Sequence, residues 1–459
     1  MSAPKPDLII IGSGQAGVPL ATRMAAAGKR VLVVERGHAG GTCVNIGCTP
    51  TKTLVASARA AHVARTAGRL GVRVADVQVD FPAVMARKDG MVRRWREGVE
   101  KHLGGAGEQL ELVRGHARFV APHRIQVGDR YFEAEQVVIN VGARPAVPAI
   151  AGLGDVPYLT STSLLALKQL PPHLVIVGAG YIACEMGQMF RRFGAEVTLV
   201  APSPRILARE ESALSEALGG VFRAEGIRLQ LGQAVVSASV SAGDVGLSLK
   251  DGTTVSGSHL LLATGRTPNT DDLGCDAAGL GLDAQGCLVV DELYQTSQSG
   301  VYAVGDCTPG PQFTHVAWDD HRVLFDVLMA RPARPRTQRL VPYTVFTDPQ
   351  VAGVGLTAEA ARKQGFEVET ASMPFGSVAR AIETDETAGV IEIVLDAKTE
   401  RILGAFIVGV DAGELIHVFS TLMASGASAR TIVDAEFVHP TFAEGLQSAV
   451  MRLPRYALS

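Results

Sequence analysis

Runs of apolar residues that end in glycine recur along the chain and predict strands leading into tight turns. Residues 7–35, DLIIIGSGQAGVPLATRMAAAGKRVLVVE, begin with such a run and continue with the small and apolar residues of a helix. The helix breaks at Gly28, and a second apolar run then predicts another strand. Residues 173–201, HLVIVGAGYIACEMGQMFRRFGAEVTLVA, repeat this order with a break at Gly194. The pattern predicts one βαβ unit used twice.

Three later apolar runs also end in glycine, and each predicts a further strand. They are QVVINVGARP (136–145), HLLLATGRTPN (259–269) and GVYAVGDCTPGPQF (300–313). Stretches rich in proline and glycine lie at 142–157 and 330–342, and we expect domain boundaries there.

The pattern changes beyond residue 342. Residues 367–375 and 390–409 alternate or pair as strands around turns, and helical segments follow near 411–425 and 441–452. We therefore expect an α/β protein with two Rossmann-like dinucleotide-binding units and an α+β C-terminal domain. The expected domain ranges are 1–150, 151–270, 271–340 (completing the first unit) and 341–459.

Composition narrows the class of protein. The chain has 459 residues, of which 47% are hydrophobic and 19% charged, so it can bury a large core. Its 43 basic and 46 acidic residues nearly balance, which argues against a nucleic-acid surface. No apolar stretch approaches the roughly 18 residues of a membrane helix, and the N-terminus does not resemble a signal peptide. We expect a cytoplasmic protein that binds neither membrane nor nucleic acid.

The segment GSGQAG matches the dinucleotide-binding fingerprint. Gly12 allows a tight turn, Gly14 lets the backbone approach a pyrophosphate, and Gly17 allows close packing of helix on strand. The following helix directs its positive end at the phosphates. Glu35 ends the next strand, where a carboxylate can accept hydrogen bonds from a ribose diol.

The second copy carries Gly178 and Gly180, but Ala201 takes the position that Glu35 holds in the first. This site lacks the carboxylate that would repel a 2′-phosphate. Arg205 and Arg209 follow closely, and an arginine there can pair with a phosphate. The alternative is that both arginines are ordinary solvated side chains. The pattern favours NADPH over NADH.

The segment GGTCVNIGCTPTK carries two cysteines, Cys43 and Cys48. A zinc site would need about four ligands, and no second cysteine pair is present. A structural disulfide would stabilise such a short loop little and would tend to be reduced in the cytosol. The third interpretation is a redox pair. A helix expected from about Pro50 places Cys48 near a positive helix end, with Lys52 one turn further, and both favour a thiolate. The remaining cysteines, Cys184, Cys275, Cys287 and Cys307, are interpreted as packing residues.

Together, GGTCVNIGCTPTK, the two fingerprints, GVYAVGD and VHPTFAEG resemble the class I FAD-dependent pyridine nucleotide–disulfide oxidoreductases. That family includes dihydrolipoamide dehydrogenase, glutathione reductase and mercuric reductase. The resemblance covers essentially the whole chain. It implies an FAD domain, an NAD(P)H domain, a central domain and a C-terminal interface domain that forms a homodimer.

The resemblance also implies roles for individual residues. Cys48 would touch the flavin and Cys43 would meet the substrate, while Lys52, paired with Glu185, would lie near flavin N5. Tyr181 would cover the flavin until nicotinamide displaces it, and the dyad His439–Glu444, from the other subunit, would move the substrate's proton. Residues expected to hold FAD are Gly12, Gly14, Gly17, Glu35, Thr42, Lys52, Ala117, Gly142, Asp306 and Thr314. Residues expected at the NADPH or NADH site are Gly178, Gly180, Tyr181, Arg205 and Gly265.

The electron acceptor is expected to be a small disulfide, a dithiol-linked substrate or a metal ion, with no resident metal. GDCTPGPQF and VFTDPQVAGVG resemble mercuric reductase-like members, and NIGCTPTKTLV resembles a reactive-chlorine-resistance copper reductase. Mercuric reductases end in a vicinal cysteine pair, whereas this chain has no cysteine beyond Cys307. Dihydrolipoamide dehydrogenase is the alternative within the family, and a redox-silent flavin-binding protein is the alternative outside it. His315, Trp318 and Asp319 are unusual near the expected flavin, but packing or capping would also explain them.

Overall fold

The computed structural model describes residues 5–456, so the outer ends of the first and last expected domains, 1–4 and 457–459, lie outside it. The chain forms two compact units. Of the described residues, unit 1 comprises 5–53, 86–146 and 265–339. Unit 2 comprises 54–85, 147–264 and 340–456. The finer division into four domains stays a prediction.

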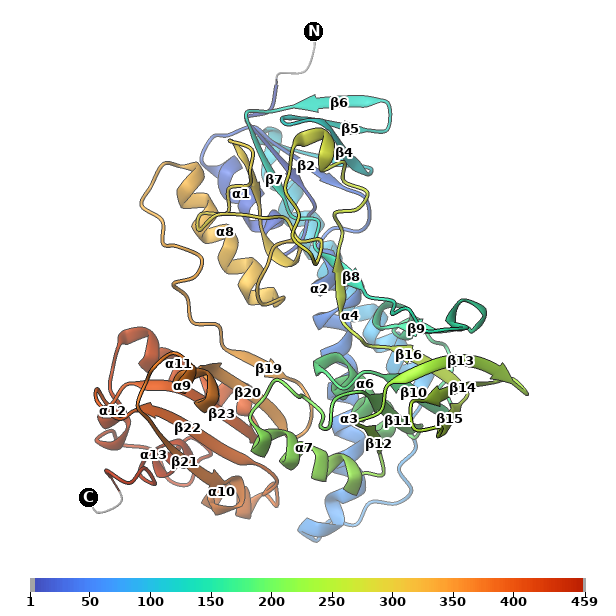
Figure 1. Cartoon of the computed structure of the whole chain (residues 1–459), viewed down its shortest axis with the longest axis vertical. Coiled ribbons are helices and arrows are strands. Elements are labelled where there is room, and N and C mark those ends of the chain that lie inside the picture. The colour runs from blue at the N-terminus through green and yellow to red at the C-terminus, as the bar shows by residue number, and fades with distance from the viewer. Residues whose placement is uncertain (1–4, 457–459) are drawn as a thin grey trace. The chain divides into compact units, whose positions relative to one another are not determined.

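Unit 1 is built on a five-stranded parallel sheet with the strand order β18-β7-β1-β2-β3. Its strands are β1 (Leu8–Ile11), β2 (Val31–Glu35), β3 (Leu110–Arg114), β7 (Gln136–Ile139) and β18 (Val301–Ala303). Leu8 and Ile10 pack with helices α1 (Gly17–Ala26) and α8 (Thr314–Leu328), which lie side by side on one face (Figure 1). Ile9 and Ile11 face the other way. This alternation buries both faces of the sheet.

The second face of this sheet packs on a three-stranded antiparallel meander. The meander is β4 (Ala117–Ala121), β5 (Arg124–Val127) and β6 (Arg130–Glu133). Two short strands, β8 (Ala143–Pro145) and β17 (Arg266–Pro268), pair with one another. Helix α2 (Gly41–Ile46) lies in unit 1, whereas α3 (Cys48–Thr66) and α4 (Phe81–Gly104) run from one unit into the other.

Unit 2 repeats the same plan. Its parallel sheet has the order β12-β11-β10-β16-β9. Residues of α6 pack on one face of it, and a meander of β13, β14 and β15 packs on the other. The strands are β9 (Leu159–Thr160), β10 (His173–Val177), β11 (Glu196–Ala201), β12 (Arg228–Leu231), β13 (Val235–Ser241), β14 (Asp244–Leu249), β15 (Thr254–Gly257) and β16 (His259–Leu262), and the helices are α5 (Ser161–Leu164), α6 (Tyr181–Phe193) and α7 (Ser212–Ala224). The predicted βαβ repeat is confirmed.

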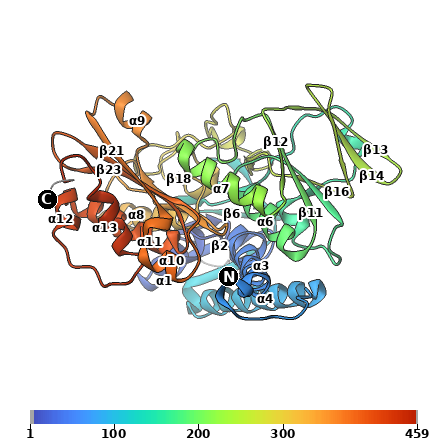
Figure 2. The same ribbon diagram turned by 90° about the horizontal axis from the view of Figure 1, so that it is seen from below.

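The C-terminal part of unit 2 is a five-stranded sheet with the order β19-β20-β23-β22-β21, all neighbours antiparallel. Figure 2 shows α11, α12 and α13 grouped beside this sheet, and α7 packs on β22 and β23. The strands are β19 (Tyr343–Val345), β20 (Gln350–Gly355), β21 (Val368–Pro374), β22 (Val390–Asp396) and β23 (Ile402–Gly409), and the helices are α9 (Ala358–Lys363), α10 (Ala379–Glu383), α11 (Ala412–Ser425), α12 (Ala429–Val433) and α13 (Glu444–Val450). The predicted α+β character is confirmed.

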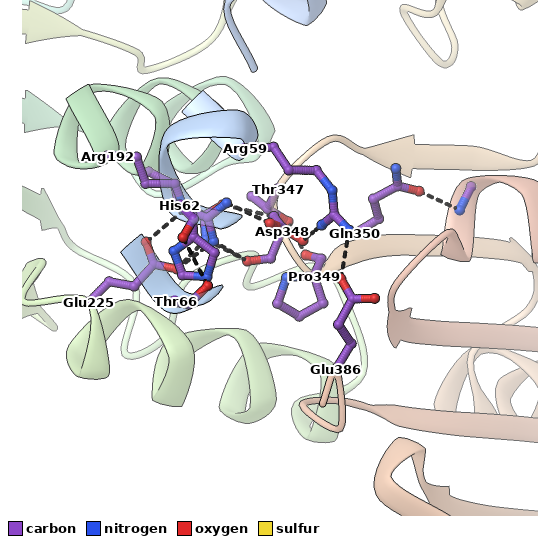
Figure 3. Close-up of polar contacts among 12 residues, drawn as sticks. Arg59, His62, Thr66, Arg192, Glu225, Thr347, Asp348, Pro349, Gln350 and Glu386 are labelled. Atoms are coloured by element: carbon purple, nitrogen blue, oxygen red, sulfur yellow. Dashed lines mark hydrogen bonds and ion pairs between the residues drawn. The ribbon is translucent and has the colours of Figure 1, made fainter. Parts of the chain in front are cut away.

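A buried charge network lies inside unit 2 (Figure 3). Arg192 pairs with Glu225 at 2.7 Å and with Asp348 at 2.6 Å, and its side chain is only 6% exposed. Arg59 pairs with the other oxygen of Asp348 and with Glu386 at 2.6 Å. Buried charges need partners. Here the pairs connect Arg59 on α3 and Arg192 on α6 to Asp348 in the turn before β20. Within the described part of the chain, no helix is long and apolar enough to cross a membrane.

Candidate active site

The first glycine turn is packed so tightly that side chains cannot enter it. A Cβ on Gly12 would lie 2.3 Å from the carbonyl oxygen of Asn140, and one on Gly17 would lie 2.2 Å from that of Gly12. The side chain of Asn140 accepts from the Gly17 amide at 2.9 Å and donates to the Val304 carbonyl at 3.1 Å. This buried asparagine joins three strand ends. The sequence analysis missed it, although a polar residue directly after an apolar strand was a usable signal.

Glu35 lies where a ribose diol could reach it. One carboxylate oxygen accepts from the amide and hydroxyl of Ser13, at 2.9 and 2.6 Å, and the other accepts from the Gly37 amide at 2.7 Å. These bonds hold the carboxylate in place and leave acceptor capacity on both oxygens. The half-buried carboxylate at the end of β2 therefore fits the adenosine ribose of FAD.

The cysteine-bearing segment lies directly beside this glycine turn. A Cβ on Gly41 would come within 2.8 Å of the Cα atom of Gly14, so only glycine allows α2 to approach so closely. Asn45 donates to the carbonyls of Ala39 and Gly41, both at 3.0 Å, and Arg96 donates to Asn45. These contacts position α2, and with it Thr42 and Cys43, next to the dinucleotide turn.

Cys43 and Cys48 lie in contact with one another. Cys48 is the first residue of α3, and its sulfur lies 3.1 Å from the hydroxyl of Thr314, the first residue of α8. The Cys43 thiol hydrogen-bonds to Cys48, and that bond together with burial raises the pKa of Cys43. Lys52 acts in the opposite direction and favours the Cys43 thiolate. The contact with Cys48 and burial therefore both favour the neutral form of the Cys43 thiol.

Asp306 lies in the turn after β18. Burial raises the pKa of its carboxyl group, and the guanidinium of Arg266, 3.3 Å away, opposes that rise. Asp320 of α8 accepts from the Gly305 amide at 2.8 Å and so fixes this turn. A half-buried carboxylate fits the ribityl hydroxyls of FAD, whose remaining contacts would come from the glycine turn and Glu35. The sequence analysis singled out Asp319 on α8, but that residue pairs with arginines, and it is Asp320 that holds the turn.

Other residues expected at FAD lie in the same unit. Gly142 has a φ of +67°, and a Cβ there would meet no atom within 4 Å. Ala117 is buried at the start of β4. The expected pair Lys52 and Glu185 joins different units, as does Gly265 with the second fingerprint, so both stay predictions. Within unit 2, Glu185 accepts from the Phe346 amide at 2.8 Å.

The second glycine turn lies in unit 2 and contacts the loop after β11. A Cβ on Gly178 would meet the Ala263 carbonyl at 2.3 Å, whereas one on Gly180 would meet nothing within 4 Å. The Leu207 amide donates to the Ala179 carbonyl at 2.8 Å, which docks the loop on the turn. Arg205 donates to the carbonyls of Ala208 and Glu210, at 3.3 and 3.1 Å, and its Nε finds no hydrogen-bond partner among the described residues.

Tyr181 begins α6 directly after this glycine turn. Its hydroxyl donates to Glu210 at 2.5 Å, and Tyr343 donates to the other oxygen of the same carboxylate. The two tyrosine rings are stacked, with centroids 5.7 Å apart and an angle of 11° between their planes. Glu210 and Tyr343 were not anticipated from the sequence.

His439 and Glu444 form the expected dyad geometry. The Nδ1 atom of His439 lies 2.8 Å from Glu444, the first residue of α13. The histidine side chain is 70% exposed and that of Glu444 only 18%, so the imidazole is held from one side and open on the other. Among residues 5–456, no three His, Cys, Asp or Glu side chains are grouped so that they could hold a metal ion.

Known proteins match this chain over almost its whole length. Residues 6–320 match the family described as pyridine nucleotide-disulphide oxidoreductase, and residues 341–450 match the dimerisation domain of that family. The chain is 35% identical to a mercuric reductase of Staphylococcus aureus over 97% of this chain and 82% of the relative. It is 34% identical to the probable pyridine nucleotide-disulfide oxidoreductase RclA of Escherichia coli, over 96% and 98%, and 34% identical to a dihydrolipoyl dehydrogenase of Thermus scotoductus, over 98% of each.

Solved structures agree with these sequence matches. The HOCl-induced flavoprotein disulfide reductase RclA of Escherichia coli aligns with a TM-score of 0.89 and 33% identity, over 97% of this chain and 99% of that one. Its Cu(II) complex aligns with a TM-score of 0.90 over 98% and 99%. The chain therefore belongs to the pyridine nucleotide-disulphide oxidoreductase family, whose members use FAD and NAD(P)H, and it is an oxidoreductase with the dimerisation domain of that family.

Proposed function

We propose that this protein takes electrons from NADPH and passes them through Cys43 and Cys48 to a small disulfide or a metal ion. The observation that carries the proposal is the contact of the two thiols at the N-terminus of α3, beside the dinucleotide-binding turn. A packing role would not require two adjacent sulfurs at that place. Bound FAD would supply the two-electron chemistry between the nicotinamide and the Cys43–Cys48 disulfide.

The surroundings of the thiols support different roles for them. Two helix N-termini, those of α3 and α8, lie at Cys48 and favour negative charge on its sulfur. Cys43, whose neutral form is favoured at rest, is proposed to exchange with the substrate once its proton has been removed. When the disulfide opens, Cys48 would hold the charge and Cys43 would exchange with the acceptor.

A proton must leave and return at the exchanging thiol. We propose that His439 of the partner subunit does this, because the imidazole is exposed on one side and a glutamate orients it on the other. The dimerisation domain supports a homodimer in which this residue reaches the other chain. The cytoplasm remains the proposed location, since disulfides found there are usually transient and catalytic.

NADPH is proposed as the preferred donor. Ala201 ends β11 without a carboxylate, and Arg209 is exposed in the loop that follows. The Arg205 side chain supports this loop by donating to the carbonyls of Ala208 and Glu210, and its guanidinium, together with that of Arg209, could pair with a 2′-phosphate. The acceptor is proposed from relatives named mercuric reductase and disulfide reductase and from a relative solved with Cu(II). Because one relative is a dihydrolipoyl dehydrogenase, lipoamide is the alternative acceptor.

The proposal is tested by anaerobic titration of the purified flavoprotein with NADPH and, separately, with NADH. Wild-type protein should need about twice as much NADPH for full reduction as Cys48→Ser, because the disulfide takes a second electron pair. Cys287→Ser, which changes a buried cysteine away from the pair, should behave like wild type. Identical end points for wild type and Cys48→Ser would reject the mechanism and favour a redox-silent flavin-binding protein.

The acceptor is then identified with the same preparations. Wild-type protein is given NADPH together with lipoamide, glutathione disulfide, mercury(II) or copper(II) in separate assays. The physiological class of acceptor should be turned over by wild type and Cys287→Ser and lost in Cys48→Ser. Turnover that survives in Cys48→Ser would mean that the acceptor takes electrons without passing through the thiols.

A further inference from the structure

The carboxylate of Glu210 binds the hydroxyl of Tyr181, and no part of the proposed function uses this carboxylate. Glu210 is 5% exposed and accepts hydrogen bonds from two phenols, Tyr181 at 2.5 Å and Tyr343 through its other oxygen. Tyr343 also stacks on Tyr181, so the tyrosine is held through its hydroxyl and through its ring. Burying a carboxylate costs free energy unless it is well hydrogen-bonded, and here both phenols help to offset that cost.

We propose that Glu210 is a positioning residue that latches Tyr181 in the position seen here and thereby sets the affinity for the nicotinamide nucleotide. This inference rests on the proposed function and on the role that the family resemblance implies for Tyr181, namely that nicotinamide displaces it. When Tyr181 moves, its hydroxyl leaves Glu210, and the carboxylate keeps only the hydrogen bond from Tyr343. The nucleotide must therefore work against one charge-assisted hydrogen bond and one ring stack.

The loop that carries Glu210 strengthens the inference. Arg205 donates to the Glu210 carbonyl at 3.1 Å, and the Leu207 amide binds the Ala179 carbonyl in the glycine turn. The latch thus belongs to the same loop as the arginines proposed for the 2′-phosphate. Burial raises the pKa of Glu210, the two phenols and Arg209 oppose the rise, and Glu211 adds to it. A nucleotide bound to this loop touches the segment that holds Tyr181.

Two variants should change the affinity in opposite directions. In Glu210→Gln the observed position of Tyr181 loses its charge-assisted hydrogen bond, so Tyr181 is displaced more readily and the Kd for NADP⁺ should fall about 10-fold. In Tyr343→Phe the stack remains, but an open Tyr181 leaves the buried carboxylate without either phenol. Opening then costs more, and the Kd should rise by a similar factor, about 10-fold.

The experiment is isothermal titration of the oxidised holoenzyme with NADP⁺ and with NAD⁺, which needs no acceptor and no turnover. A latch acts on the nicotinamide end, so both nucleotides should shift by the same factor in each variant. Glu211→Gln is a control that removes the charge of the neighbouring residue, whose carboxylate accepts from the Ala358 amide. This variant should show only the part of the Kd change that comes from losing a nearby negative charge. Tyr456→Phe, which removes a buried phenol from Glu400 at 2.9 Å, controls for loss of a tyrosine hydroxyl elsewhere.

Stopped-flow reduction by NADPH supplies the second readout. The limiting rate of flavin reduction should stay near the wild-type value in both latch variants, while the half-saturating NADPH concentration follows the two Kd changes. A shift of both variants in the same direction, or of neither, would overturn the latch. Failure of wild-type protein to be reduced by either nucleotide would instead reject the proposed function, so the two failures are distinguishable.

Discussion

Cys43 and Cys48 carry the same group in different surroundings. Cys48 begins a helix and meets a threonine hydroxyl at the N-terminus of another, whereas Cys43 is held as a thiol by its bond to Cys48. The proposed division of tasks, with charge held at Cys48 and exchange at Cys43, depends on this difference. The surroundings of the two thiols differ because α3 and α8 begin at Cys48 and at its neighbour Thr314. The thiol group itself is the same in both cysteines.

His321 on α8 provides a pH-dependent contribution to stability. Its side chain is 3% exposed, its Nδ1 has no hydrogen-bond partner among the described residues, and burial lowers its pKa to about 4. Because the unfolded histidine titrates near 6.5, the unfolded state binds more protons between these values. Stability should therefore be complete above about pH 6.5 and fall by ~2–3 kcal/mol as the pH drops towards 4.

The His321→Leu variant tests this expectation by urea unfolding at pH 7.5 and pH 5. The variant should lose less stability on acidification than wild type does. His116→Gln, a change at an exposed histidine, should keep the wild-type loss. An equal loss in wild type and His321→Leu would show that this histidine does not contribute to the acid sensitivity.

At the scale of elements, unit 2 is held by charge as well as by apolar packing. The helices α3 and α6 and the turn before β20 meet at Arg192, Arg59 and Asp348 (Figure 3). Removing one member leaves buried charges without compensation, which costs more than the pair contributes in total. Burial lowers the pKa of His62 beside this network, and the charge of Arg192 lowers it further, whereas Glu225 and Asp348 oppose the fall.

The variant Arg192→Met should lower the free energy of unfolding by about 3 kcal/mol or more, because Glu225 and Asp348 lose a buried partner. Arg228→Met is the matched control, since Arg228 pairs with Glu196 at 2.8 Å with both side chains about 60% exposed. That surface change should cost under about 1 kcal/mol. Denaturant unfolding of both variants checks this, and equal losses would contradict a special role for the network.

At the scale of the whole molecule, the exposed imidazole of His439 bears on assembly. Val438 is 76% exposed and His439 follows it, within the segment that matches the dimerisation domain. An apolar residue and an oriented imidazole on the surface are what a subunit interface would cover. In the proposed function, the open side of the histidine would face a substrate at the thiols of the other chain.

Mixed dimers test whether the site is shared. His439→Ala and Cys48→Ser should each be inactive as homodimers. A purified dimer of one chain of each should regain about half of wild-type activity, because one of its two sites then has both intact residues. Activity is measured with the acceptor found in the panel. No recovery in the mixed dimer would mean that both residues act within one chain.

The sequence by itself determined the elements and the motif chemistry. Apolar runs ending in glycine correctly marked β1, β10 and their helices, because a tight turn and close strand packing need glycine at fixed positions. The cysteine pair and the missing carboxylate at Ala201 were also readable, since they depend on residue type and spacing. The start of α3 was expected near Pro50 and lies two residues earlier, an ordinary uncertainty of helix ends.

Only the tertiary structure decided which distant side chains meet. Asn140, Asp320, Glu210 and Tyr343 carry no motif, and each becomes significant through a partner far away in the sequence, such as Glu210 and Tyr343, 133 positions apart. The meander strands that cover the second face of each parallel sheet were likewise not anticipated. The residue pattern of a short segment shows whether it favours a helix or a strand. Long-range contacts depend on how whole elements pack, and no short segment encodes that packing.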